Sequence, residues 1–157
     1  MSQWTDYDSA TCSVARTAAL VGDAWTVLVL RDLFNGVRRF DDLADHLGIA
    51  RNVLTRRLAA LVEGGLVTKT PYREPGRRER HEYRLTPAGK DLRVVVTALK
   101  DWGDAHLAGE AGPPLVTRHA GCGGEVHAEI RCAEGHLIDD RTKLIAEPGP
   151  GARLRSA

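Results

Sequence analysis

The stretch "IARNVLTRRLAALVEGGLVTKT" (residues 49–70) decides the fold. Its leucines at positions 54, 58 and 61 recur at spacings of four and three residues, and such spacings place side chains on one face of an α-helix. Polar and cationic side chains take the other face, and two consecutive glycines end the pattern. The stretch therefore predicts a short helix with an apolar back, an arginine-rich front and an abrupt end.

The residues before this stretch predict a second helix and a tight turn. In "DLADHL", Leu43 and Leu47 face one way, Asp41 precedes them as a candidate N-cap, and Gly48 follows as a stop. Two helices joined by a short turn that contains glycine form a helix-turn-helix, whose second helix enters the major groove of DNA. We therefore expect the helix that begins near Ala50 to be a recognition helix.

The segment after the recognition helix predicts a β-hairpin with a basic tip. "LVTKT" and "HEYRL" alternate like half-buried strands around the loop "PYREPGRRER", and "VRRF" (residues 37–40) predicts one more small strand. Between residues 51 and 93, eleven Lys or Arg stand against five Asp or Glu. A basic hairpin of this kind is typical of a wing that contacts DNA phosphates.

Two further helices complete the predicted domain. "VGDAWTVLVLRDLFNG" is apolar over more than one face and predicts a central core helix. Thr86 and Pro87 are an N-cap and a first helical residue for "AGKDLRVVVTALKDWGDAHL". The apolar stripe of this last helix is wide for a helix outside the core, which indicates a partner helix from a second copy of the chain. The predicted dimer-interface residues are Leu92, Val95, Val96, Leu99 and Trp102.

These segments, in this order, resemble the HxlR-type winged helix-turn-helix regulators of bacteria, part of the broader MarR-like group, over residues 12–102. The resemblance rests on Cys12, "GDAWTVLVLRDL", "RRFDDL", "LTRRLAALVEGGLV" and "YRLTPAGKDL". It implies a dimeric transcriptional regulator whose N-terminal and last long helices build the dimer. One departure is Ala50, where such regulators often have Ser, and the missing cap costs the helix about 1 kcal/mol.

The expected fold class is mainly α with a small β-hairpin wing: a winged helix-turn-helix domain followed by a small irregular or β, zinc-ribbon-like C-terminal segment. We expect the DNA-binding and dimerisation domain to span residues 1–110. The ribbon-like appendage follows at residues 111–147, and residues 148–157, rich in Pro and Gly, form a flexible tail.

The outer face of the recognition helix and the wing supply the predicted DNA contacts. Asn52 suits adenine and Arg56 suits guanine, through bidentate hydrogen bonds in the major groove. The alternative for this helix face is an ordinary solvated surface. The full predicted set is Arg38, Arg51, Asn52, Thr55, Arg56, Arg57, Arg73, Arg77, Arg78 and Arg80.

Cys12 is the candidate sensor. The chain has three cysteines, an odd number that does not suggest a disulfide scaffold. Cys12 lies near the start of the first helix, where a thiol becomes a better nucleophile, and the resemblance implies a role in sensing oxidants, quinones or aldehydes. The alternative is a small buried hydrophobic residue at the dimer interface.

The segment "RHAGCGGEVHAEIRCAEGH" carries two candidate pairs of zinc ligands. His119 and Cys122 form the first pair, and Cys132 and His136 form the second. Paired ligands on two tight turns are typical of a zinc ribbon. The resemblance implies a second Cys near Gly135, so His136 stands in one residue late. The competing interpretation is a relic ribbon that is stable without metal, and no cofactor is required.

The predicted function is a DNA-binding transcriptional regulator that binds a near-palindromic operator as a homodimer and responds to an oxidant or small-molecule effector. The composition, 43% apolar and 27% charged, suits a soluble globular protein. No apolar run reaches the length of a signal peptide or a membrane span, so we expect a cytoplasmic location without a membrane partner. Two alternatives are a winged helix that docks proteins and a zinc-dependent enzyme built on the C-terminal Cys and His residues.

Overall fold

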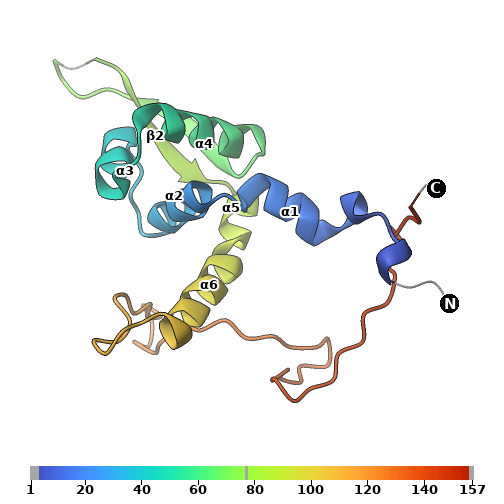
Figure 1. Ribbon diagram of the computed structural model, residues 1–157. Helices are drawn as coiled ribbons and strands as arrows, with labels where there is room; N and C mark the ends of the chain where they lie inside the picture. The colour runs from blue at the N-terminus through green and yellow to red at the C-terminus, as the bar shows by residue number, and fades with distance from the viewer. Residues whose placement is uncertain (1–3, 77, 156–157) are drawn as a thin grey trace. The chain divides into compact units, whose positions relative to one another are not determined.

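The computed structural model describes residues 4–76 and 78–155 of the chain (Figure 1). The chain forms two compact units, Met1–Lys90 together with Ile145–Ala157, and Asp91–Leu144. The boundary near residue 90 differs from the expected one at residue 110. The last long helix, α6 (Arg93–His106), therefore groups with the C-terminal appendage.

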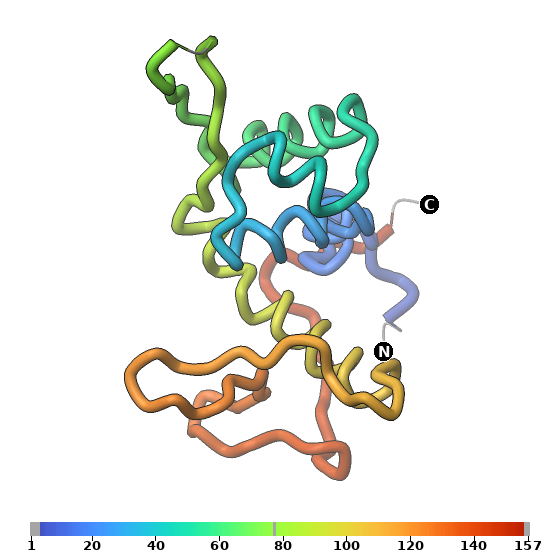
Figure 2. The backbone as a smooth tube through the Cα atoms, turned by 90° about the vertical axis from the view of Figure 1, so that its left-hand side faces the viewer, coloured from blue at the N-terminus to red at the C-terminus, as the bar shows by residue number. Residues whose placement is uncertain are grey.

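The first unit is mainly helical with one β-hairpin, as predicted. Figures 1 and 2 both show the tip of this hairpin extending beyond α3 and α4. Its helices are η1 (Trp4–Asp6), η2 (Ser9–Thr11), α1 (Ser13–Val21), α2 (Ala24–Phe34), α3 (Phe40–Leu47), α4 (Arg51–Glu63) and α5 (Pro87–Asp91), and its strands are β1 (Val67–Tyr72) and β2 (Arg80–Leu85).

The core of the first unit is built from aliphatic side chains of α2, α3 and α4. Leu54, Leu58 and Leu61 of α4 are fully buried, which confirms the predicted apolar back of this helix. They share the core with Leu30 of α2 and Leu43 of α3. Burying each such side chain stabilises the fold by about 1.5–3 kcal/mol, so the buried face fixes which side of α4 points outward.

Helix α3 begins earlier than predicted, and its cap differs. Arg39 is the N-cap residue and makes no side-chain capping bond, whereas Asp41 lies in the first turn. The predicted capping role of Asp41 is therefore wrong, because its carboxylate accepts a 2.6 Å hydrogen bond from Arg51 instead. Gly48 ends the helix at a φ of 60°, a left-handed conformation that favours glycine.

The hairpin has longer strands than the sequence pattern predicts. Strands β1 and β2 are antiparallel, with Val67 opposite Leu85 and Tyr72 opposite Arg80. The small strand expected at residues 37–40 is reduced to a single bridge between Arg39 and Glu82. This bridge lies on β2, so β1 is an edge strand that tolerates a proline.

The connection from the hairpin to the next helix is held by Thr86. Its hydroxyl accepts a 3.1 Å hydrogen bond from the Gly89 N–H and donates one of 2.7 Å to the Gly65 carbonyl, so the predicted N-cap is confirmed. A Cβ at Gly89 would lie 2.0 Å from the Leu66 carbonyl oxygen, which explains the glycine. The single helix predicted from here on is interrupted at Leu92, which separates α5 from α6.

The two ends of the described chain pair with each other in the first unit. Tyr7 and Leu154 form an antiparallel bridge. The Asp8 N–H donates to the Arg153 carbonyl at 2.8 Å, and the Arg155 N–H donates to the Asp6 carbonyl at 2.8 Å. Part of the segment expected to be a flexible tail is thus held against the N-terminal residues.

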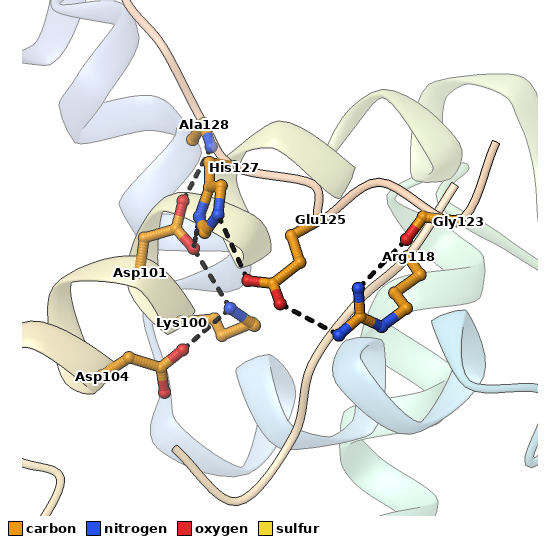
Figure 3. Close-up of polar contacts among 8 residues, drawn as sticks. All are labelled: Lys100, Asp101, Asp104, Arg118, Gly123, Glu125, His127 and Ala128. Carbon is orange, nitrogen blue, oxygen red and sulfur yellow. Dashed lines mark hydrogen bonds and ion pairs between the residues drawn. The ribbon is translucent and has the colours of Figure 1, made fainter. Parts of the chain in front are cut away.

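The second unit consists of α6 and an irregular segment that a polar cluster attaches to it (Figure 3). Asp101 of α6 accepts a 2.7 Å hydrogen bond from the Ala128 N–H and pairs with His127 at 3.4 Å. Lys100 bridges Asp101 at 3.2 Å and Asp104 at 2.8 Å. One turn of helix therefore anchors a segment that lies 27 residues further along the chain.

Candidate nucleic-acid interface

The outer face of α4 presents polar side chains, because the leucines of this helix are turned inward. Asn52, Thr55 and Arg56 are all exposed. The Thr55 hydroxyl donates to the Arg51 carbonyl at 2.8 Å, and the Asn52 side-chain oxygen accepts from the Val53 N–H at 2.9 Å. Within the described part of the chain, no ion pair engages Arg56, so its five donors face solvent.

Arg57 differs from its neighbour Arg56. Its guanidinium lies 2.8 Å from the carboxylate of Asp23, and its side chain is 35% exposed. Asp23 is the N-cap of α2 and accepts a hydrogen bond from the Thr26 N–H. The ion pair directs Arg57 towards the start of α2, so this arginine joins two helices of the first unit.

The hairpin supplies further arginines. Arg73 and Arg78 are exposed in the loop between the strands, and Arg38 is exposed beside β2. Arg80, at the start of β2, is exposed and forms an ion pair of 3.4 Å with Asp41. The predicted contact Arg77 lies outside the described residues.

Arg39 is a basic residue of this region that sequence reasoning missed. Its guanidinium lies 3.0 Å from Glu74 and stacks 4.8 Å above the centre of the Tyr72 ring. These contacts connect the start of α3 with the hairpin loop. The signal was present in the sequence, since Arg39 directly follows the predicted contact Arg38.

Asp41 joins the recognition helix to the hairpin. One carboxylate oxygen pairs with Arg51 at 2.6 Å, and the other pairs with Arg80 at 3.4 Å. The hydrogen bond from Arg51 holds the pKa of Asp41 below its ordinary value of 3.8, against a smaller opposing effect of burial. The carboxylate is therefore charged at neutral pH and partly neutralises both arginines.

Cys12 is half-buried and occupies the N-cap position of α1, where its side chain makes no capping hydrogen bond. It lines a cavity of about 870 Å³ together with the aromatic residues Trp4 and Tyr7. Arg155, from the other end of the chain, lines the same cavity. Cys12 therefore lies at this cavity and outside the buried core.

The four predicted zinc ligands remain as two separate pairs. His119 Nδ1 lies 3.2 Å from Cys122 Sγ, and His136 Nδ1 lies 3.5 Å from Cys132 Sγ. Among the described residues, no three His, Cys, Asp or Glu side chains form a group that would hold a metal ion. The structure therefore does not assemble a complete zinc site, and zinc binding stays a prediction.

The predicted dimer face of α6 is uncovered in the single chain. Val95, Leu99 and Trp102 are 42%, 51% and 59% exposed, and Leu92 and Val96 are half-buried. No residue of α6 is buried among those the structure describes. Much of this apolar stripe is therefore exposed, although the Trp102 ring lies 5.0 Å from that of His106.

Over residues 4–76 and 78–155, no single helix is long and apolar enough to cross a membrane, and only the sharply bent pair of α1 and α2 meets that test by length and composition.

Comparison with known proteins identifies the family. The model of the HxlR-like helix-turn-helix family matches residues 20–111. A Mycobacterium tuberculosis protein named as an HTH-type transcriptional regulator is 46% identical over 147 residues, which cover 92% of this chain and 90% of that protein. An alignment that covers 92% of this chain must include residues beyond 111, where the family model ends. The similarity to this protein therefore includes part of the C-terminal appendage.

Two solved structures show the same relationship in three dimensions. The transcription factor PA1607 aligns with a TM-score of 0.77 and 29% identity, over 88% of this chain and 96% of that chain. The oxidized form of the redox regulator HypR aligns with a TM-score of 0.55 and 27% identity, over 60% of this chain and 97% of that chain. With its exposed recognition helix and basic hairpin, the chain belongs to the HxlR-like helix-turn-helix family of DNA-binding transcriptional regulators, which are not enzymes.

Proposed function

We propose that the protein binds a near-palindromic operator as a homodimer, with α4 of each copy in the major groove and each hairpin against the neighbouring backbone. The observation that carries this proposal is the outward face of α4, where Asn52, Thr55 and Arg56 are exposed opposite three buried leucines. Side chains near the start of a recognition helix are those that reach base edges.

Within this interface, base reading and backbone binding fall to different residues. Arg56 and Asn52 are the side-chain types that form bidentate hydrogen bonds with guanine and adenine, and Asn52 would first exchange its 2.9 Å contact with the Val53 N–H. Arg73 and Arg78, on the hairpin loop, supply contacts to phosphates that carry little sequence information. Arg57 is left out of the proposed contacts, because its ion pair with Asp23 occupies it.

The homodimer is supported by the uncovered apolar face of α6. Isologous pairing of Leu99 and Trp102 with the same residues of a second copy would bury side chains that are more than half exposed in the single chain. Two recognition helices related by a two-fold axis read half-sites about 34 Å apart. The proposed signal is an oxidant or electrophile that reacts with Cys12, and the likeness to the redox regulator HypR supports it.

The proposal is tested by comparing two arginine variants on operator and random DNA. The operator is first isolated from genomic fragments captured by the purified protein. Replacing Arg56 with Ala should weaken operator binding by about 1–3 kcal/mol and reduce the preference for the operator over random DNA. Replacing Arg78 with Ala should weaken binding to both sequences equally and reduce the salt slope by about one.

Arg141, exposed in the second unit, is the matched control, since its replacement with Ala removes the same charge. Fluorescence anisotropy over a range of salt concentrations measures all three variants. An equal loss on operator and random DNA for Arg56→Ala would contradict base reading by this residue. If the wild-type protein shows no salt-dependent binding to any duplex, the winged helix serves another partner and the proposal is wrong.

A further inference from the structure

Three charged side chains from three elements converge between the recognition helix and the hairpin. They are Asp41 of α3, Arg51 of α4 and Arg80 of β2. Asp41 Oδ1 lies 2.6 Å from Arg51 Nη2, and Asp41 Oδ2 lies 3.4 Å from Arg80 Nη1. The three residues line a cavity of about 400 Å³, together with Tyr72 and Tyr83.

The position of Arg51 is fixed by more than its ion pair. Its guanidinium carbon lies 4.8 Å from the centre of the Phe40 ring, so a cation–π contact supports the group next to its contact with Asp41. A planar guanidinium that is held in this way keeps its donors oriented before any ligand arrives. The site is therefore organised in the free protein.

The cluster has the chemistry of a phosphate site that already contains an anion. Each oxygen of the Asp41 carboxylate takes one arginine, and the two non-bridging oxygens of a phosphodiester would take two arginines in the same manner. The side chains of Asp41 and Arg80 are 42% and 44% exposed, and that of Arg51 is 64% exposed. A phosphate can therefore reach both guanidinium groups without opening the core.

We propose that Arg51 and Arg80 form a binding site for one phosphate of the DNA backbone, and that Asp41 is a built-in competing anion that weakens binding to DNA of any sequence. The inference rests on the proposed function, since it concerns the same surface. A phosphate must separate the arginines from Asp41 before it binds, which lowers the contribution of the backbone. Base contacts made by residues such as Arg56 then account for a larger share of the affinity.

The test compares Asp41→Asn with Asp42→Asn. Asp42 is the next residue of the same first turn, it is exposed, and the described contacts give it no ion pair. Both variants lose one negative charge, but only Asp41→Asn frees the two arginines. On a labelled random-sequence duplex of about 30 base pairs, we expect Asp41→Asn to bind about fivefold more tightly than wild type. Its salt slope should be steeper by about one.

A double-mutant cycle assigns this gain to the two arginines. In the Arg51→Gln, Arg80→Gln background, Asp41→Asn should bring no gain, because the groups that Asp41 neutralises are absent. Thermal unfolding of each variant checks that the fold is retained. If Asp41→Asn is too unstable to measure, Asp41→Ser repeats the test with a smaller neutral side chain.

The outcomes separate this inference from the proposed function. A wild-type protein that binds DNA, with Asp41→Asn no tighter or Asp42→Asn equally tight, overturns the inference alone. Tighter binding of inorganic phosphate by Asp41→Asn without tighter DNA binding also overturns it, since the site would then serve a small anion. A wild-type protein without DNA binding removes the proposed function, whatever Asp41 does.

Discussion

At the scale of single residues, Cys12 is only partly exposed to solvent, but it lines a cavity that can hold a small molecule. It stands at the N-cap of α1, half-buried, in the wall of a cavity that also contains Trp4 and Tyr7. An aromatic wall beside a thiol suits small planar electrophiles as well as peroxides. Peroxide oxidises a thiol to a sulfenic acid and is itself reduced to water, which would place a polar group in this wall.

We predict that hydrogen peroxide weakens DNA binding of the wild-type protein by roughly an order of magnitude, the size of a typical coupling between two sites. The Cys12→Ser variant should bind DNA equally well with and without peroxide. The chain supplies its own control, because Cys122 and Cys132 are exposed and free. A variant with both of these replaced by Ser should respond like wild type, and a response that follows them instead assigns the sensing to the appendage.

Neighbouring arginines show where prediction from sequence stops at this scale. Periodicity places Arg56 opposite the buried leucines and Arg57 at the flank of that outer face, and the exposed Arg56 agrees with that prediction. It does not reveal that the N-cap of another helix, Asp23, lies 2.8 Å from Arg57. In the same way, the position of Asp41 before a helical pattern predicts a cap. Its actual partners, Arg51 and Arg80, are 10 and 39 residues away in the sequence and cannot be identified from that local pattern. Helix phase is a local property, whereas ion pairs depend on the packing of distant segments.

At the scale of elements, the hydrogen-bonded turn of α6 around Asp101 determines whether the irregular segment stays attached. Burial raises the pKa of Asp101, but hydrogen bonds from the Ala128 N–H, Lys100 and His127 together lower it below the ordinary value of 3.8. A carboxylate whose pKa is lowered by folding stabilises the folded state fully at pH values above its ordinary pKa. This stabilisation is lost as the pH falls through the lowered pKa. Figure 3 shows the groups that would then separate.

We predict that Asp101→Asn increases the hydrogen exchange rate of the Ala128 amide about fivefold at neutral pH, as expected for loss of a charged acceptor that is partly exposed. In wild type the same amide should become less protected only below about pH 3.8. Asp104→Asn is the matched control, since Asp104 also pairs with Lys100 but does not contact Ala128. Equal exchange in the two variants would show that Asp101 does not anchor the segment.

The elements themselves were largely predictable, since helices and strands follow local patterns and their boundaries follow caps and glycines. The helix-turn-helix, the hairpin and the Thr86 cap all appear where periodicity placed them. The interruption at Leu92 and the extension of β1 through Pro71 were missed. Neither leaves a local signal, because continuous apolar spacing runs across Leu92 and proline usually argues against a strand.

At the scale of the whole molecule, the proposed homodimer depends on one face of α6. We predict that Leu99→Asp converts the protein to a monomer and weakens operator binding at least tenfold, because a single copy reads only one half-site. Val94 provides the control: it is 57% exposed, but helical spacing places it on the other side of α6. Analytical ultracentrifugation of Leu99→Asp and Val94→Asp measures the assembly. A Leu99→Asp protein that remains a dimer would show that another surface forms the interface.

The pairing of Tyr7 with Leu154 means that both ends of the chain belong to the same unit. The first unit contains residues that precede the second unit in the sequence and residues that follow it. In chain order, Asp91–Leu144 is therefore an insertion into the first unit and not a C-terminal extension of it. Exchanging that insertion requires two junctions, one near residue 90 and one near residue 145. A stop codon placed anywhere inside it would also remove Leu154, the bridge partner of Tyr7, and Arg155, which lines the same cavity as Cys12.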